Sequence, residues 1–176
     1  KLITAKAPGK LYIAGEYAVV ENGYPAILVA LNQFVTCSIK VSPADTGRII
    51  SEQYHENSLL WRRQGDKMVV DQRDNPFAYI LSAISVTEEY ARSLDRQLQI
   101  YDIYIDSQLD SANGKKYGLG SSAAVTVATV KALCLFYDLP VNKDKLFKLA
   151  AIAHFAVQGN GSLGDVAASV YGGWIA

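Results

Sequence analysis

Two glycines, two serines and two alanines come together in the segment KKYGLGSSAAV, residues 115–125, directly after two lysines. Small residues let a phosphate group approach the backbone closely, and a helix that begins here would direct its unpaired N–H groups and partial positive charge at that phosphate. The serine hydroxyls could contact phosphate or Mg²⁺. The predicted phosphate-binding residues are Gly118, Leu119, Gly120, Ser121, Ser122 and Ala123. Taken alone, the segment fits a serine-capped glycine turn equally well.

The same spacing matches the dinucleotide-binding fingerprint G-x-G-x-x-G/A, once from Gly118 and again from Gly159. That fingerprint follows a strand directly and opens a helix that leads to a second strand. Here a long polar loop precedes Gly118, and the helix after it leads into another helix, while the second match itself follows a helix. The context therefore disfavours a dinucleotide site. The Walker sequence G-x-x-x-x-G-K-[ST] is absent, so the chain is not an ordinary P-loop NTPase.

Two further segments combine glycines with groups that could do chemistry. APGKLYIAGEYAVV holds Lys10, Glu16 and Tyr17 around a predicted strand, and GNGSLGD presents Ser162 and Asp165 on a glycine loop. Taken alone, Lys10 is more simply explained as an exposed lysine at a strand edge, and Asp165 as the N-cap of the next helix. These residues support a functional interpretation only in combination with the GLGSSAAV segment.

Charge and composition exclude several classes of partner. Lys and Arg number 17, as do Asp and Glu, so no global basic field would recruit nucleic acid. The 11 tyrosines are spread out and show no nucleic-acid-binding pattern. His55 and His154 are isolated and are expected at surface and helix positions, and no Cys/His spacing typical of a metal site occurs. The expected partner is a small molecule, with neither nucleic acid nor membrane, and the oligomeric state stays open.

The length of 176 residues, 50% of them hydrophobic, fits one domain with a substantial core. Cys37 and Cys134 lie in apolar segments and are expected to be buried free thiols, which favours a cytoplasmic location. No apolar run reaches the about 18 residues of a transmembrane helix, and the first residues lack a signal-peptide pattern. The chain begins with Lys1 and ends in YGGWIA, so we expect it to be a fragment of a longer protein.

The elements that must position these segments change from strands to helices along the chain. Asn75 is predicted to cap a helix that begins at Pro76, and Asn142 to cap a later one that reaches about residue 157. A helix over 121–137 lies between them. Strands are predicted at 2–5, 11–14, 26–41, 48–51, 58–70 and 98–105, with turns at Pro8-Gly9 and at 64–66. Strands first and helices later predict an α+β fold.

Together the three segments resemble the GHMP kinase family. PGKLYIAGEYAVVENGYPAI resembles its first motif and KKYGLGSSAAV its second, whose core is GLGSSAA. Within the family the chain most resembles the bacterial phosphomevalonate kinases, because of GEYAVVENGYPAI, the lysine pair ahead of the second motif and the GNGSLGD loop. The resemblance extends over all 176 residues, which would form the N-terminal domain. Many members have a proline a few residues ahead of GLGSS, which is absent here.

The resemblance implies a ribosomal protein S5 domain 2-like fold, with the C-terminal ferredoxin-like domain and its third motif absent. It also implies ATP-dependent phosphorylation of 5-phosphomevalonate to 5-diphosphomevalonate, with ATP and Mg²⁺ required. Mevalonate kinase is the nearest alternative. A catalytically silent half-kinase that only binds nucleotide is a second alternative, and a dinucleotide-binding oxidoreductase is a third.

The resemblance also assigns roles to individual residues. The GLGSSAA loop would hold the ATP phosphates, and Ser122 would ligate Mg²⁺. Lys10 would stabilise the transferring phosphoryl group, and Asp165 matches the catalytic aspartate, which we expect to orient Lys10 and the metal. The residues implied to bind the acceptor substrate are Glu16, Tyr17, Lys116 and Ser162.

Overall fold

The structure is a computed structural model that describes residues 1–14, 27–52, 58–70, 77–108, 121–159, 164–172 and 174–175. Within these ranges, the side chains of residues 10–14, 27–32, 121 and 174–175 lie outside the description.

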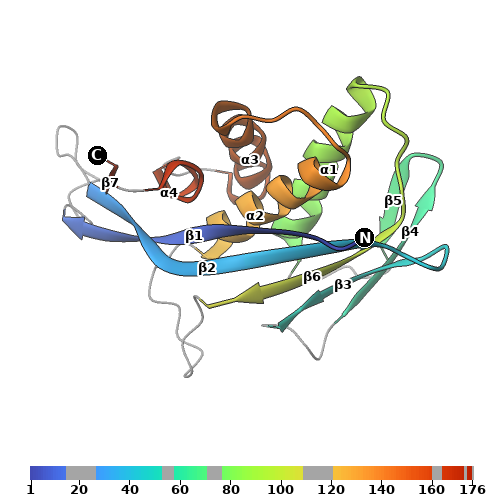
Figure 1. Cartoon of the computed structure of the whole chain (residues 1–176), viewed down its shortest axis with the longest axis horizontal. Helices are drawn as coiled ribbons and strands as arrows, with labels where there is room; N and C mark the ends of the chain where they lie inside the picture. The colour runs from blue at the N-terminus through green and yellow to red at the C-terminus, as the bar shows by residue number, and fades with distance from the viewer. Residues whose placement is uncertain are drawn as a thin grey trace.

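The described chain forms two layers, a mixed sheet and a group of helices that cover one of its faces (Figure 1). The strands are β1 (Ile3–Ala14), β2 (Ile27–Val41), β3 (Gly47–Ser51), β4 (Leu59–Gln64), β5 (Lys67–Val70), β6 (Tyr101–Ser107) and β7 (Trp174–Ile175). The helices are α1 (Ala78–Ser93), α2 (Ser121–Phe136), α3 (Lys143–Gln158) and α4 (Gly164–Tyr171). The predicted α+β class is confirmed.

The sheet is organised around the long strand β2. Its strand order is β1-β2-β6-β3-β4-β5, and β7 pairs with β2 beyond the end of β6. All pairs are antiparallel except β3 with β6. Alternate residues of β6 face the helices, so Tyr101, Ile103 and Ile105 are buried while Asp102 and Tyr104 face away. The core therefore lies between one face of the sheet and the helical layer.

The N-terminal strand corrects one prediction. The sequence predicts a turn at Pro8-Gly9 between two short strands, but β1 continues from Ile3 to Ala14 and absorbs these residues as a register shift between Pro8 and Lys10. Proline lacks a backbone N–H, so it is tolerated in a strand at the edge of a sheet. β1 is such an edge strand, because β2 is its only neighbour in the described sheet.

Of the two helix caps predicted from the sequence, one is confirmed and the other is wrong. Asn142 caps α3, and its side chain accepts a hydrogen bond from the backbone N–H of Lys145 at 2.7 Å, which confirms the prediction. The cap at Asn75 is wrong, because α1 begins at Ala78 and its N-cap is Phe77, which makes no side-chain cap hydrogen bond. Phe77 is fully buried, so core packing rather than capping sets the start of α1.

A buried carboxylate joins the helices to the far end of the sheet. Glu88 on α1 forms a bidentate ion pair with Arg63 on β4, whose side chain is only 9% exposed. The hydroxyls of Tyr101 and Tyr137 donate to the same carboxylate at 2.6 and 2.7 Å. Burial and the charge of Glu88 raise the pKa of both tyrosines. Burial acts to lower the pKa of Arg63, but the hydrogen bond and charge of Glu88 raise it above its usual value.

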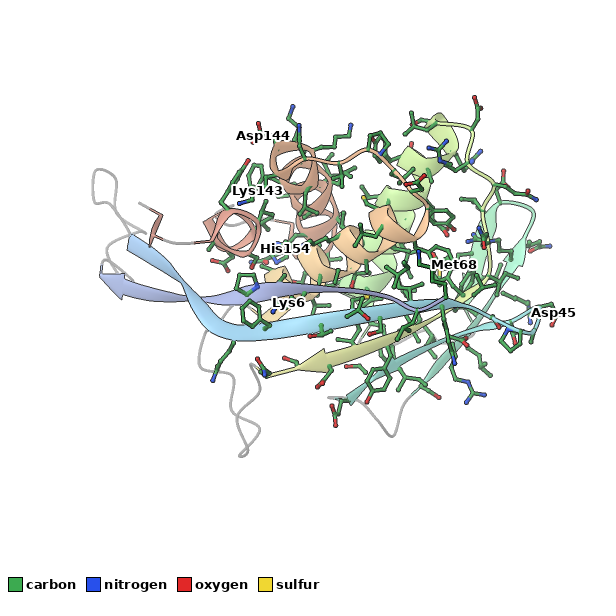
Figure 2. The ribbon with its side chains drawn as sticks, viewed as in Figure 1. Lys6, Asp45, Met68, Lys143, Asp144 and His154 are labelled. Carbon is green, nitrogen blue, oxygen red and sulfur yellow. The ribbon has the colours of Figure 1, made fainter. Side chains whose placement is uncertain are left out.

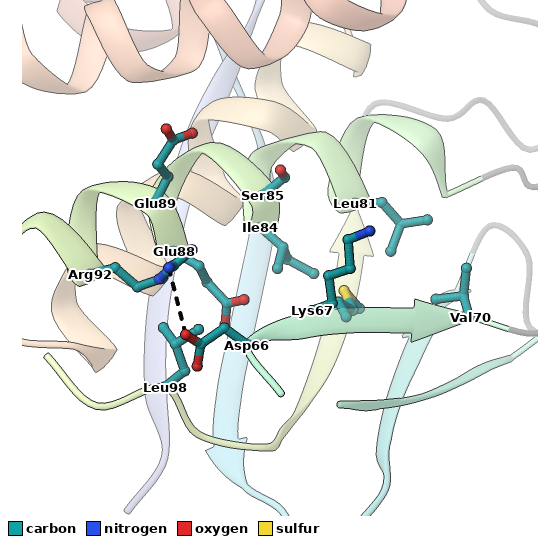
Figure 3. A pocket seen from close by; sticks show the side chains of 11 residues that line it. Asp66, Lys67, Val70, Leu81, Ile84, Ser85, Glu88, Glu89, Arg92 and Leu98 are labelled. Atoms are coloured by element: carbon teal, nitrogen blue, oxygen red, sulfur yellow. Dashed lines mark ion pairs between the residues drawn. The ribbon is translucent and has the colours of Figure 1, made fainter. Parts of the chain in front are cut away.

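A pocket of about 350 Å³ lies between the β4–β5 hairpin and α1, and Glu88 is among the residues that line it (Figure 3). Its wall combines apolar side chains such as Leu81 and Leu98 with an exposed ion pair between Arg92 and Asp66, 3.6 Å apart. Among the predicted site residues that the structure describes, none lines it.

The two thiols are buried and free, as predicted. Burial raises the pKa of Cys37 to about 12 and that of Cys134 to about 11, so both remain protonated at neutral pH. In the part of the chain that the structure describes, none of the helices is long and apolar enough to cross a membrane.

We expect Glu88→Ala to lower the free energy of unfolding by about 3–5 kcal/mol, because it leaves the buried guanidinium of Arg63 without its counter-charge. Urea unfolding followed by tryptophan fluorescence measures this change. The matched control is Arg92→Ala, which breaks an ion pair whose side chains are 56% and 66% exposed. This control is expected to change the free energy by no more than about 1 kcal/mol. If both variants lowered the free energy of unfolding equally, the buried network would contribute no more to stability than an exposed ion pair.

Candidate active site

The N-terminus of α2 is confirmed at Ser121, where the predicted phosphate-binding segment enters its helix. The helix is buried from its first turn, since Ala123 and Ala124 are both 0% exposed. These small side chains pack against the core while the first N–H groups of the helix stay without intrahelical partners. A helix end of this kind attracts anions through its N–H groups and its dipole.

Ser122 lies in this first turn, and its side chain contacts another helix. Its Oγ lies 3.1 Å from Nε2 of His154 on α3, within hydrogen-bond distance. His154 lies on α3, which confirms its predicted helix position, and it is only 4% exposed. His55, predicted at the surface, lies outside the described residues. Burial lowers the pKa of His154 below its usual value, and the negative charge of Asp165 opposes that shift. The imidazole is therefore neutral at physiological pH.

Asp165 lies in the first turn of α4, where its negative charge interacts favourably with the helix dipole. Val166 is fully buried and holds the same turn against the core. Further along α4, Ser169 donates a hydrogen bond to the backbone carbonyl of Pro8 on β1 at 2.9 Å. One helical turn separates Asp165 from Ser169, and Pro8 comes two residues before Lys10. The contact therefore brings the helix of Asp165 to the strand of Lys10.

The predicted site residues thus fall into three groups. Ser122 lies within hydrogen-bond distance of His154, the charge of Asp165 acts on the pKa of the same imidazole, and Ala123 lies in the buried turn that follows Ser122. The backbone of Lys10 pairs with Ala30 in the sheet, while its side chain and that of Ser121 lie outside the description. The predicted residues that lie outside the described residues altogether are Glu16, Tyr17, Lys116, Gly118, Leu119, Gly120 and Ser162.

Comparison with known proteins identifies the family. The family model described as GHMP kinases N terminal domain matches residues 78–173, more than half of the chain. The chain belongs to the GHMP kinase family. The matched segment contains Ser122, His154 and Asp165, so the arrangement around α2 lies within the part that defines this family.

Individual GHMP kinases are similar along the whole chain. A phosphomevalonate kinase from Streptomyces sp. (strain CL190) is 38% identical over 185 residues, covering 100% of this chain and 49% of that protein. A mevalonate kinase from Methanocaldococcus jannaschii is 30% identical over 169 residues, covering 96% of this chain and 51% of that protein. A structure of Streptococcus pneumoniae phosphomevalonate kinase in complex with phosphomevalonate and AMPPNP has a TM-score of 0.75 at 34% identity, covering 96% of this chain and 47% of that one.

These findings confirm the resemblance and the expected domain fold. The chain spans about half the length of the GHMP kinases that it matches. Family membership also accounts for the glycines at 118 and 120 as part of the GLGSSAA motif, which removes the case for a dinucleotide-binding oxidoreductase.

His154 is the residue of this GHMP kinase site that the sequence reasoning missed. Its position carried a usable signal, because the buried residues of α3 are Leu146, Leu149, Ala150 and Ala153, and residue 154 continues that helical stripe. The spacing alone therefore predicts a buried histidine. Its partner Ser122 is 32 residues away in the sequence and belongs to another helix, so the hydrogen bond itself needed the fold.

We expect Ser169→Ala to lower the free energy of unfolding by about 1–3 kcal/mol, because it leaves the half-buried carbonyl of Pro8 without this donor. Chemical denaturation measures the change. Ser93→Ala is the matched control, since Ser93 donates to the carbonyl of Tyr90 at 2.6 Å in an exposed position where water can replace it. An equal or larger loss in the control would show that the link between α4 and β1 adds nothing beyond an ordinary surface hydrogen bond.

Proposed function

We propose that the complete protein transfers the γ-phosphoryl group of ATP to 5-phosphomevalonate and forms 5-diphosphomevalonate and ADP. The observation that carries the proposal is the N-terminus of α2, where helix N–H groups and the Ser122 hydroxyl lie beside an imidazole that also interacts with Asp165. The acceptor is inferred from the 38% identity to a phosphomevalonate kinase along the whole chain. Residues 1–176 would form the N-terminal domain, and the activity belongs to the complete protein.

The chemistry requires the site to overcome charge repulsion between two phosphorylated substrates. Phosphoryl transfer is catalysed mainly by positioning and by electrostatic stabilisation of the transferring group. The N–H groups at the start of α2, with Gly118 and Gly120 ahead of them, would hold the ATP phosphates. Lys10 would stabilise the charge on the transferring group, and Lys116 and Ser162 would bind the phosphate of the acceptor.

The donor set at this helix end fits Mg²⁺. Mg²⁺ prefers oxygen ligands, and in kinase sites it is held by one or two protein groups together with substrate phosphates and water. Ser122 supplies a hydroxyl within hydrogen-bond distance of His154, and Asp165 supplies a carboxylate whose charge acts on the same imidazole. The described residues contain no cluster of three or more His, Cys, Asp or Glu side chains that could hold a metal without such phosphates. When bound, the ion would neutralise phosphate charge during the transfer.

Asp165 is proposed to orient Lys10 and the metal rather than to abstract a proton. The second pKa of a phosphate monoester is about 6, so the attacking oxygen is already mostly ionised at neutral pH. Proton abstraction would be essential for a hydroxyl acceptor such as mevalonate, but it adds little for a phosphate acceptor.

Mevalonate kinase is a second candidate, because mevalonate kinases also match nearly the whole chain. A coupled assay of ADP release with each acceptor separates the two activities. We expect turnover with phosphomevalonate and little with mevalonate. Turnover with mevalonate alone would replace the proposed activity by the second candidate, and turnover with neither would contradict both.

The same assay tests the acceptor site through Lys116→Ala. Loss of a hydrogen bond to a charged group should raise the KM for phosphomevalonate by about 10- to 100-fold and leave the KM for ATP unchanged. Lys148→Ala removes an exposed lysine of α3 that belongs to none of the motifs, and it should change neither KM. An unchanged KM for phosphomevalonate in Lys116→Ala would remove Lys116 from the acceptor site.

For Asp165→Asn we expect a fall in kcat of about 10²–10³-fold, because a charge that orients the transferring group is lost. The pH–rate profile should keep its shape, since the limb near pH 6 would belong to the phosphate of the substrate. Steady-state rates between about pH 5 and 9 measure both effects, and they bracket the phosphate pKa of about 6. A limb that is present in the wild type and vanishes in Asp165→Asn would identify Asp165 as a general base.

A further inference from the structure

The hydroxyl of Ser122 contacts a neighbouring helix, whereas the hydroxyls of Thr126 and Thr129 on the same helix bond to its backbone. Thr126 and Thr129 each donate to the backbone carbonyl four residues earlier, Thr126 to Ser122 and Thr129 to Val125, both at 2.7 Å. Such back-bonding is the usual fate of a hydroxyl within a helix. Ser122 contacts the ring of His154 on a neighbouring helix, at 3.1 Å, and the carbonyl four residues before it, that of Gly118, lies outside the described residues. A tertiary contact therefore helps to orient the side chain in the first turn of α2.

The imidazole that makes this contact is itself fixed from a third helix. The ring of Tyr79 on α1 lies against His154, with the ring centroids 5.0 Å apart and the planes 31° from parallel. Ser82, also on α1, donates to the carbonyl of Ala153 at 2.7 Å, so the backbone beside His154 is held as well. Figure 2 shows His154 on the inner side of α3, toward α2 and the sheet. A buried ring held on two sides has little freedom to turn away from Ser122.

A serine hydroxyl has one proton and two lone pairs, and a neutral imidazole has one accepting nitrogen. A hydroxyl that ligates a cation must turn its lone pairs toward the ion, so its proton needs an acceptor elsewhere. We propose that His154 is a positioning residue whose Nε2 accepts the Ser122 proton and so holds the Ser122 oxygen in the rotamer that receives the Mg²⁺ of bound ATP. This inference rests on the proposed function and assigns to His154 no contact with the substrate or the metal.

Two variants of His154 separate hydrogen bonding from packing. His154→Gln keeps an amide near the position of Nε2 that can accept a proton, whereas His154→Leu fills similar volume without an acceptor. Partners of metal ligands typically contribute about 10- to 100-fold to metal affinity, so we expect His154→Leu to weaken binding of Mg·ATP by that factor. Binding of ATP without Mg²⁺ should stay unchanged, and His154→Gln should recover most of the loss. Calorimetric titration of the complete protein with ATP, with and without Mg²⁺, measures each affinity.

The matched control is Ser82→Ala, which removes a hydrogen bond between α1 and α3 next to His154 but leaves the ring and Ser122 in place. If His154 only packed the helices together, this control and His154→Leu would weaken binding alike, with or without Mg²⁺. Equal Mg·ATP affinity in His154→Leu and the wild type would overturn the inference. So would a loss in His154→Gln as large as that in His154→Leu.

The ¹⁵N signals of His154 give a readout that does not depend on activity. We expect the wild-type spectrum to show an unprotonated Nε2 and a protonated Nδ1, and Ser122→Ala to shift the Nε2 signal. A protonated Nε2 in the wild type would overturn the inference, because that nitrogen would donate rather than accept. A wild-type protein that binds Mg·ATP but phosphorylates neither acceptor would contradict the proposed function, while the affinities of the variants would still decide the role of His154.

Discussion

The carboxylate of Glu88 is the point at which the helical layer and the sheet are tied together. It accepts hydrogen bonds from Arg63 on β4, from Tyr101 on β6 and from Tyr137 just beyond the end of α2. A charge taken out of water is tolerated only when it is paired and its hydrogen-bonding capacity is used. A shift of any one of these elements would leave a buried charge or hydroxyl without a partner, so the network permits one relative placement of α1, α2 and the sheet.

The Glu88 network also constrains the candidate active site, because α2 connects the two. Tyr137 fixes one end of this 16-residue helix, and Ser122 with its contact to His154 fixes the other. Val127 and Leu133 between them are almost fully buried, so the helix is packed along its length. A packed helix moves as a rigid body, and its N–H groups keep their directions. The proposed catalysis relies on positioning, so it would gain its precision from core packing some 20 Å away, at about 1.5 Å of helix rise per residue.

Predictions from the sequence are correct where the structure depends on neighbouring residues, and they are wrong where it depends on packing between distant residues. Strand alternation, the Asn142 cap and the helix after the GLGSS motif depend on neighbouring residues, and these predictions are confirmed. The turn at Pro8-Gly9 was wrong because pairing with β2 overrides a local turn signal. The cap at Asn75 was wrong because burial of Phe77 sets the start of α1. The helix position of His154 was predicted correctly, but its hydrogen bond to Ser122 was not, because that partner lies on another helix 32 residues away in the sequence.

The positions of the three motifs in the fold explain why each motif alone fits several functions, while the three together indicate one family. Lys10 lies near one end of the chain and Asp165 near the other, and the hydrogen bond from Ser169 to Pro8 that brings their elements together spans 161 residues. Contacts between residues so far apart form only after much of the chain is ordered, because the loop between them must first lose its conformational freedom. In the sequence, Lys10 taken alone therefore resembles an ordinary exposed lysine, and no local feature around Asp165 indicates the role that is proposed for it. The fold brings the elements of these two residues together, because β1 packs against α4 and both pack against α2.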